Sequence, residues 1–316
     1  MRRQLSGALI VLSMMLALSV RTVAQFGREA QDRPGQEQAK TDTPAKEPPP
    51  PLFPRHRRGT YRDLQGLETI DATPQSPPLE TDDPTVPEPG EYEINLFTAA
   101  DLSKGAQSVD LLFIDANYGV LPKFAGHELP TQVKFEIPVT SSREHGEPFT
   151  HGVGAAKFGL KFNFYTNDHR GLAIAVYPQV EFEAPGTGAV QKGLAERGQT
   201  LVLPLLVAKE FHYFTFVANG TVSKPVHDPE RESTTTISAG FGRAFTRKVA
   251  MMIELNNESS TDFKDNHLLL LNVGMIHGVR GIIAYAKAGH SLSSDDGFGH
   301  TYLGVGLKFM LNRRRP

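Results

Sequence analysis

Residues 157–164 read Lys-Phe-Gly-Leu-Lys-Phe-Asn-Phe, and this stretch decides the fold class. Its apolar side chains occupy alternate positions, so an extended strand would carry them on one face and the lysines on the other. A helix would instead bring Lys157, Lys161 and Phe164 together, which is not a stripe that a core could bury. The stretch therefore predicts a β-strand with one apolar and one polar face.

The same alternation recurs from residue 91 onward, where β-branched and aromatic residues replace the prolines of the preceding segment. Most of the alternating stretches have at least the roughly 9–11 residues that a tilted strand needs to cross a bilayer. We predict an all-β, antiparallel up-and-down transmembrane β-barrel of about twelve strands. The strands are expected at 91–100, 107–118, 129–140, 150–165, 170–183, 199–209, 211–222, 233–245, 248–257, 266–276, 279–289 and 300–311.

Short and long connections alternate between the predicted strands. The tight ones lie at 167–169, near 210, at 246–248 and at 277–278, and the longer polar ones at 141–149, 184–198, 223–232, 257–265 and 290–299. A barrel that threads an outer membrane has short turns on the periplasmic side and longer loops outside. Residues 119–128 depart from the pattern, because a longer connection stands where a short turn is expected.

Periodicity alone does not say which face of the barrel is wet, because soluble and membrane barrels carry their apolar side chains on opposite faces. About twelve strands enclose a bore too wide for small side chains to fill with an apolar core, so the polar face is expected inside. The alternative is a soluble sheet whose charged face is solvated. For the membrane barrel we predict the lumen-lining residues Glu93, Lys134, Glu136, Lys157, Lys161, Tyr177, Glu181, Glu183, Glu254, Lys287 and Lys308.

The last predicted strand ends in an apolar row. Leu, Val and Phe occupy the odd-numbered positions of residues 303–311 and are interleaved with Gly304, Gly306 and Lys308; Phe309 lies near the C-terminus. An aromatic residue near the end of a C-terminal strand resembles the signal that outer-membrane barrel assembly recognises. We therefore expect the barrel-assembly machinery as a partner during biogenesis, and outer-membrane lipid around the finished barrel.

The N-terminal part of the chain has a different composition. Residues 1–24 begin with Arg2 and Arg3, continue with a short apolar run and end with small residues before Gln25, which is typical of a secretory signal peptide. Residues 25–90 hold many prolines between Glu, Gln, Asp and Thr, so we expect a disordered Pro-rich linker. The expected domains are therefore the signal peptide 1–24, the linker 25–90 and the outer-membrane barrel 91–316.

Composition excludes several function classes. The chain has no cysteine, which excludes disulfides, thiolate metal sites and a catalytic thiol. Its net charge of −2 gives no basic field for nucleic acid. Its mean hydropathy of −0.29 suits a soluble protein, but barrel strands hide their apolar residues by alternation.

No motif in the sequence points to catalysis, a metal ion or a cofactor, and we expect none of them. The scattered histidines lack the spacing of a zinc site, and Gly152-Val153-Gly154 does not begin a helix as a phosphate-binding loop would. An outer-membrane lipase would need a Ser–His pair near one rim. The neighbours Ser142 and His145, and Ser291 and His290, are more simply read as polar loop residues.

Short motifs between residues 117 and 223 resemble a bacterial outer-membrane family. They include Asn117-Tyr118-Gly119, the alternating stretch 157–162, Tyr177-Pro178 followed by residues 184–188, and Leu203-Pro204-Leu205. Their order and spacing are similar to those of the family named for the meta-pathway of phenol degradation, whose members are described as transporters. The resemblance implies an outer-membrane barrel that moves small molecules, without catalytic residues.

The leading functional hypothesis is an outer-membrane channel for small solutes with a mixed-charge lumen. One alternative is a non-conducting barrel that serves as an anchor or scaffold, with a periplasmic Pro-rich arm. Another is a soluble secreted β-protein that binds a ligand or glycan.

Overall fold

The computed structural model describes residues 69–211, 214–226, 228, 231–263, 267–279 and 282–312. The expected signal peptide 1–24 and residues 25–68 of the expected linker lie outside these ranges. Within them, no helix is long and apolar enough to cross a membrane.

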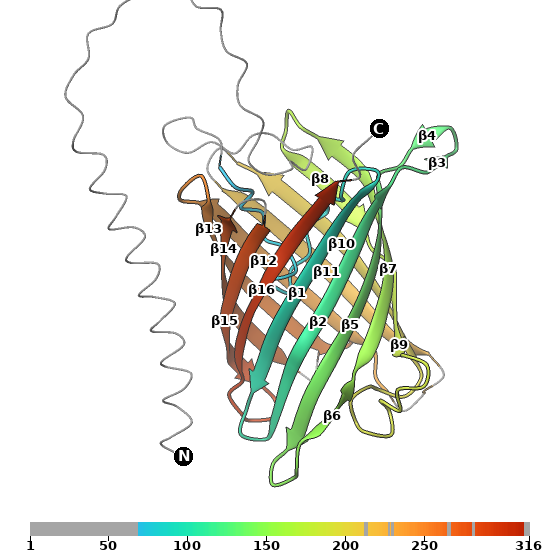
Figure 1. Ribbon diagram of the computed structural model, residues 1–316, viewed down its shortest axis with the longest axis vertical. Coiled ribbons are helices and arrows are strands. Elements are labelled where there is room, and N and C mark those ends of the chain that lie inside the picture. Colours follow the sequence, from blue (N-terminus) through green and yellow to red (C-terminus); the bar gives the residue numbers. More distant parts are fainter. Residues whose placement is uncertain are drawn as a thin grey trace, which may run out of the picture. The chain divides into compact units, whose positions relative to one another are not determined.

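The described residues form an antiparallel sheet that closes into a barrel (Figure 1). The strands are β1 (Glu91–Leu102), β2 (Ala106–Val120), β3 (Lys123–Phe124), β4 (His127–Glu128), β5 (Thr131–Glu144), β6 (Thr150–Val153), β7 (Ala155–Asn167), β8 (Leu172–Val176), β9 (Gln179–Glu183), β10 (Gln199–Glu210), β11 (Thr215–Val226), β12 (Thr234–Ala244), β13 (Val249–Ser260), β14 (Leu268–Val279), β15 (Ile282–Ser294) and β16 (Thr301–Asn312). Pairing of β1 with β16 and of β5 with β7 closes the ring.

The barrel has 12 strand positions, which confirms the predicted fold class. Two of the positions are interrupted: β6 and β7 together form one, and β8 and β9 together form another. The break between β8 and β9 falls at Tyr177 and Pro178, because a proline has no N–H to donate to the ladder. Each predicted strand overlaps an observed one, with shifts of a few residues at the ends.

Residues 119–128, the predicted exception among the short turns, contain a small hairpin. Strands β3 and β4 pair around Ala125 and Gly126, whose φ angles are 49° and 82°. Positive φ at both central residues is the geometry of a tight hairpin turn. The longer connection is therefore a folded projection beyond the barrel end, as Figure 1 shows.

The outer face of the barrel is apolar. On β10, Leu201, Leu203 and Leu205 are about half exposed, whereas Thr200 and Leu206 on the opposite face are buried. Exposed aromatic and aliphatic side chains recur on β7, β12 and β13 in the same alternating manner. An apolar outer face of this extent is the surface that a transmembrane barrel presents to lipid.

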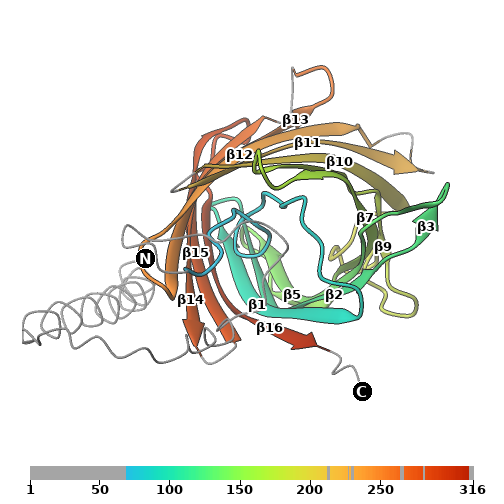
Figure 2. The same cartoon turned by 90° about the horizontal axis from the view of Figure 1, so that it is seen from above.

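Residues 69–90, which we name the lumen segment, lie inside the barrel (Figure 2). The Ile70 N–H donates to the Arg247 carbonyl in the β12–β13 turn, and the Gly90 N–H donates to the Gly119 carbonyl at the end of β2. The segment therefore enters and leaves at the end of the barrel that carries the tight turns. The sequence prediction included these residues in the linker 25–90; the structure instead gives them defined partners in the barrel wall.

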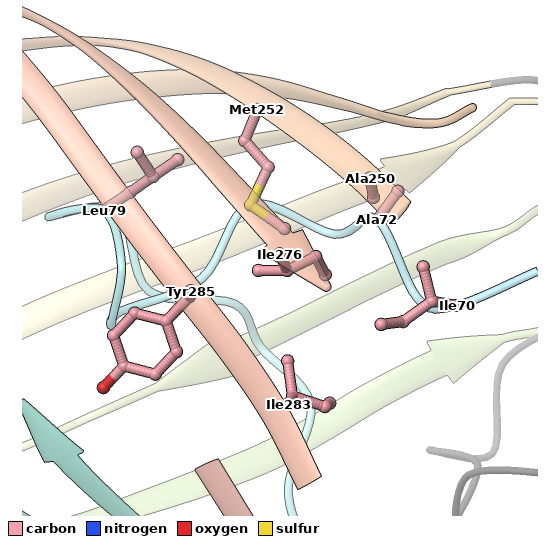
Figure 3. Packing of buried hydrophobic residues seen from close by; sticks show 8 residues of the cluster. All are labelled: Ile70, Ala72, Leu79, Ala250, Met252, Ile276, Ile283 and Tyr285. Atoms are coloured by element: carbon pink, nitrogen blue, oxygen red, sulfur yellow. The ribbon is translucent and has the colours of Figure 1, made fainter. Parts of the chain in front are cut away.

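An apolar cluster fixes one side of the lumen segment. Figure 3 shows Ile70, Ala72 and Leu79 of the segment packed among side chains of the barrel wall. The wall residues of the cluster are Ala250, Met252, Ile276, Ile283 and Tyr285. Each of these side chains is at most 8% exposed, so the few apolar residues of the segment are removed from water as in a small core.

Glycines in the wall make room for the segment. A Cβ at Gly242 would lie 1.7 Å from the carbonyl oxygen of Ala72, and one at Gly119 would lie 2.2 Å from that of Glu88. Such contacts exclude any side chain at these positions unless the segment moves. The shape of the wall and the path of the segment are therefore matched.

Candidate functional site: the barrel lumen

Strand register aligns charged residues across one side of the lumen. Asp115, Glu136, Lys157 and Glu181 are successive Cα partners on β2, β5, β7 and β9. Lys134 lies beside this row, with its Nζ 2.6 Å from Glu136 and 3.6 Å from Asp115. Lys157 Nζ lies 3.9 Å from Glu136 and 3.6 Å from Glu181. We name these five residues the ion-pair row; in it each lysine contacts two carboxylates, which offsets the cost of taking these charges out of bulk water.

Asp115 was not in the predicted lumen set. It is 1% exposed and accepts a hydrogen bond of 3.0 Å from Asn95, which is itself fully buried. The signal in the sequence was its spacing of two residues from Phe113 and from Asn117, which places all three on one face of the second predicted strand. The predicted set contained no residue of that strand.

Strand β7 binds residues 82–84 of the lumen segment. Lys161 Nζ lies 3.1 Å from Asp82 and donates to the Asp83 carbonyl at 2.8 Å. Asn163 donates to the Pro84 carbonyl at 2.8 Å. The desolvation of Asp82 raises its pKa, but the ammonium groups of Lys161 and Lys134 outweigh burial and hold this pKa below its usual value.

The opposite wall holds the other side of the segment. Glu254, 1% exposed, accepts hydrogen bonds from the Glu80 and Thr81 N–H groups and from the Asn272 side chain. Lys287 pairs with Glu80, and its ammonium lowers the pKa of the Glu80 carboxyl against the effect of burial. The segment is therefore bound by polar contacts on both sides of the barrel.

The remaining predicted lumen residues also lie on the inner face. Lys308 lies 2.9 Å from Glu93 and donates to Gln75 of the segment at 2.7 Å. Tyr177 is 1% exposed, with the ammonium groups of Lys161 and Lys134 at 5.1 Å and 5.8 Å from its ring centroid. Glu183 differs in position: it accepts a hydrogen bond from Val190 N–H and so fastens the 184–198 loop.

A water-accessible cavity of about 640 Å³ occupies the other part of the lumen, and we name it the vestibule. Residues 76–80 and Asp82 of the lumen segment form one boundary. Its walls reach Ser223, Thr234 and Leu268, which lie near the strand ends that carry the longer loops. On the other side of the segment, a cavity of about 20 Å³ borders Glu93 and Lys161. Along the described part of the chain, the lumen is thus wide toward the longer loops and narrow at the segment.

The vestibule also contains charged residues that the predicted set lacked. Asp101 and Asp110, from β1 and β2, and Glu258 from β13 line it together with Arg231. Asp110 accepts a hydrogen bond of 2.7 Å from Thr140. A bulge on β2 between Asp110 and Leu112 shifts the register, so the alternation of the neighbouring residues does not place Asp110 on the inner face. Asp101 and Glu258 follow the same alternation as Glu93 and Glu254, but the predicted set did not include them.

His300 links two elements at the rim of the barrel. Its Nδ1 lies 3.1 Å from Asp101 and its Nε2 lies 2.8 Å from Asp296. Burial lowers the pKa of His300, but the two carboxylates outweigh it and raise this pKa above its usual value. Hydrogen bonds from Ser294, the Phe298 N–H and His300 hold the pKa of Asp296 at about 2.

In the described ranges, the Ser–His neighbours of the sequence do not hydrogen-bond to each other through their side chains. Ser291 Oγ accepts a hydrogen bond of 2.8 Å from the His300 N–H, and the ring of His290 contacts Thr301 at 3.2 Å. Among the residues that the structure describes, no group of three or more His, Asp or Glu side chains is arranged to hold a metal ion.

No protein-family model matches the chain, and no curated protein matches it by sequence. Among solved structures, the chain is similar to an outer-membrane channel from Pseudomonas putida F1, with 10% identity and a TM-score of 0.62 over 74% of this chain and 100% of that one. A KdgM porin has 9% identity and a TM-score of 0.43 over 68% of this chain and 98% of that one. A NanC porin has 7% identity and a TM-score of 0.46 over 69% of this chain and 100% of that one. The likeness to the first structure shows that the chain has the fold of an outer-membrane β-barrel.

Proposed function

We propose that the protein is an outer-membrane channel for small solutes, in which the lumen segment sets the narrowest part of the path. The observation that carries this proposal is the vestibule of about 640 Å³, bounded on one side by residues of the lumen segment. An outward apolar face and an inward charged face suit a barrel that holds water inside a bilayer. The resemblance to the phenol-degradation meta-pathway family supports the same class of function.

Deletion of residues 69–88 tests this proposal. The intact protein should give small single-channel currents in a planar lipid bilayer, because the lumen segment fills much of the bore. The shortened chain should give larger currents, because the vestibule would then continue through the barrel. Heat-dependent gel mobility of both proteins serves as the control for barrel folding.

The same experiment separates the channel from a non-conducting barrel. The fit of the wall glycines to the lumen segment favours a fixed segment, and a fixed segment suits an anchor or scaffold as well as a narrow pore. Currents from the shortened chain but none from the intact protein would support the non-conducting form. The absence of currents from both folded proteins would contradict a channel.

A further inference from the structure

Carboxylates outnumber cationic side chains in the lining of the vestibule. Among the described residues, eight acidic and four basic side chains line it. The acidic residues are Glu80, Asp82, Asp101, Asp110, Asp115, Glu136, Glu181 and Glu258, and the basic ones are Lys134, Lys157, Arg231 and Lys287. The predicted set, with equal numbers of Lys and Glu, had suggested a balanced lumen, whereas the actual lining has an excess of negative charge.

All four basic side chains of this lining already have carboxylate partners. Lys134 and Lys157 belong to the ion-pair row, and Lys287 pairs with Glu80 of the lumen segment. Arg231 lies 3.6 Å from Glu196 in the 184–198 loop and donates to a backbone carbonyl of that loop. An anionic solute would therefore meet basic groups that are already neutralised, together with unpaired carboxylates.

Several acceptors in the wall remain open. Asp110 and Glu258 have no basic side chain within 4.0 Å among the described residues, and Asp110 receives only the Thr140 hydroxyl. Asn219 also lines the vestibule; it is 8% exposed, and its Oδ1 has no hydrogen-bond partner in the described part of the chain. A carbonyl oxygen buried without a donor is unfavourable, and a ligand that carries N–H groups would satisfy it.

The open acceptors on β11 and β13 belong to one polar patch. Glu258 is the cross-strand partner of Thr236, which is in turn the partner of Thr221. Asn219 lies two residues before Thr221 on β11, and Asn256 lies two residues before Glu258 on β13, so each shares the inward face of its strand. All five residues line the vestibule, so the patch offers one carboxylate surrounded by hydroxyl and amide groups.

We propose that the vestibule is a binding site for small organic cations, with protonated amines as the ligand class. Ammonium groups donate hydrogen bonds and carry a positive charge. They would therefore give Asp110 and Glu258 the cationic partner that the described side chains do not provide. The hydroxyl and amide groups of the patch hydrogen-bond the remaining polar atoms of such a ligand. Transport of such cations rests on the proposed channel function. Their binding in the vestibule does not require that the barrel conducts.

Calorimetric titration of the full-length, detergent-folded protein tests the site, with spermidine as the cationic probe and citrate as the anionic probe. Spermidine should bind at low ionic strength and citrate should not. The double variant Asp110→Asn with Glu258→Gln should weaken spermidine binding by about tenfold, as expected for the loss of two partly exposed charge contacts. The double variant Glu144→Gln with Glu147→Gln is the matched control, because it removes two charges from exposed positions outside the vestibule.

Equal binding of citrate, an unchanged spermidine affinity in the double variant, or no spermidine binding to the folded protein would each overturn the proposal. Single-channel recordings in planar bilayers measure conduction independently of spermidine binding, so the binding site and the channel are tested separately. Conduction without spermidine binding would contradict the site alone. Spermidine binding without conduction, in both the intact and the shortened chain, would contradict the channel alone.

Discussion

At the residue scale, adjacent positions on one strand have opposite environments. Leu160 points outward with the apolar row of β7, whereas Lys161 is 2% exposed and holds Asp82 inside the barrel. The alternation of residues 157–164 is therefore also a division between lipid and lumen. A substitution has a different consequence depending on which side of the wall its side chain faces.

Leu160→Arg should impair folding into membranes, because an arginine on the lipid face costs roughly 2–4 kcal/mol near the bilayer centre. Lys161→Leu should leave the barrel able to fold, since its side chain faces the lumen, but it removes the ammonium partner of Asp82. Urea titration of the protein folded in lipid vesicles measures both effects. The reverse order of stability would mean that the inner and outer faces are exchanged.

At the scale of elements, the lumen segment and the strands fit each other through backbone contacts. The wall approaches the segment most closely at Gly242 and Gly119, where a methyl group would collide with carbonyl oxygens. Backbone atoms of the segment cannot retreat as the end of a flexible side chain can. These glycines therefore determine whether the segment stays in place, although they contribute no side-chain contact.

Gly242→Ala should displace the lumen segment near Ala72 while the barrel remains folded. Amide hydrogen exchange in residues 69–90 should then increase, because the segment loses its protected hydrogen bonds. Gly220→Ala is the matched control, since an added Cβ there would meet no atom within 4 Å. Unchanged exchange in the Gly242 variant would contradict the close contact.

At the scale of the whole molecule, the barrel and the segment are joined by ion pairs on two sides. Glu80 pairs with Lys287 on β15, and Asp82 pairs with Lys161 on β7. Both carboxylates have a lowered pKa, so they are ionised whenever the lumen is near neutral pH. The negative charges of Glu80 and Asp82 therefore help to hold the lumen segment in the narrow region of the lumen.

Acidification should release the lumen segment before it unfolds the barrel. A carboxylate with a lowered folded pKa contributes its full stabilisation above its unfolded pKa, here 4.5 for Glu80 and 3.8 for Asp82. That contribution is lost as the pH falls through the lower folded pKa. The protection of residues 69–90 against hydrogen exchange, relative to an unstructured chain at the same pH, should therefore be constant from neutral pH down to that range and decrease below it. An equal loss of protection in Lys287→Ala at neutral pH would support the pair between Glu80 and Lys287. Protection that changes neither with pH nor in this variant would contradict it.

The sequence by itself determined the strands and, within each regular strand, which residues share a face. Alternation is a local property, and it is legible in residues 157–164 without any knowledge of their neighbours. It therefore predicted the fold class and directed attention to residues such as Lys134, Lys161 and Lys308, all of which are buried on the inner face.

Only the tertiary structure decided which charges meet and what fills the lumen. Register aligns Asp115 with Glu136 and Lys157 across strands, and bulges turn Asp110 inward at positions that local alternation does not fix. The lumen segment reads as a linker because its own few apolar residues could not offset the entropy of ordering. Its partners come from the barrel, as in the bond between Asp82 and Lys161, which are 79 residues apart, so its order depends on a wall that only the closed barrel provides.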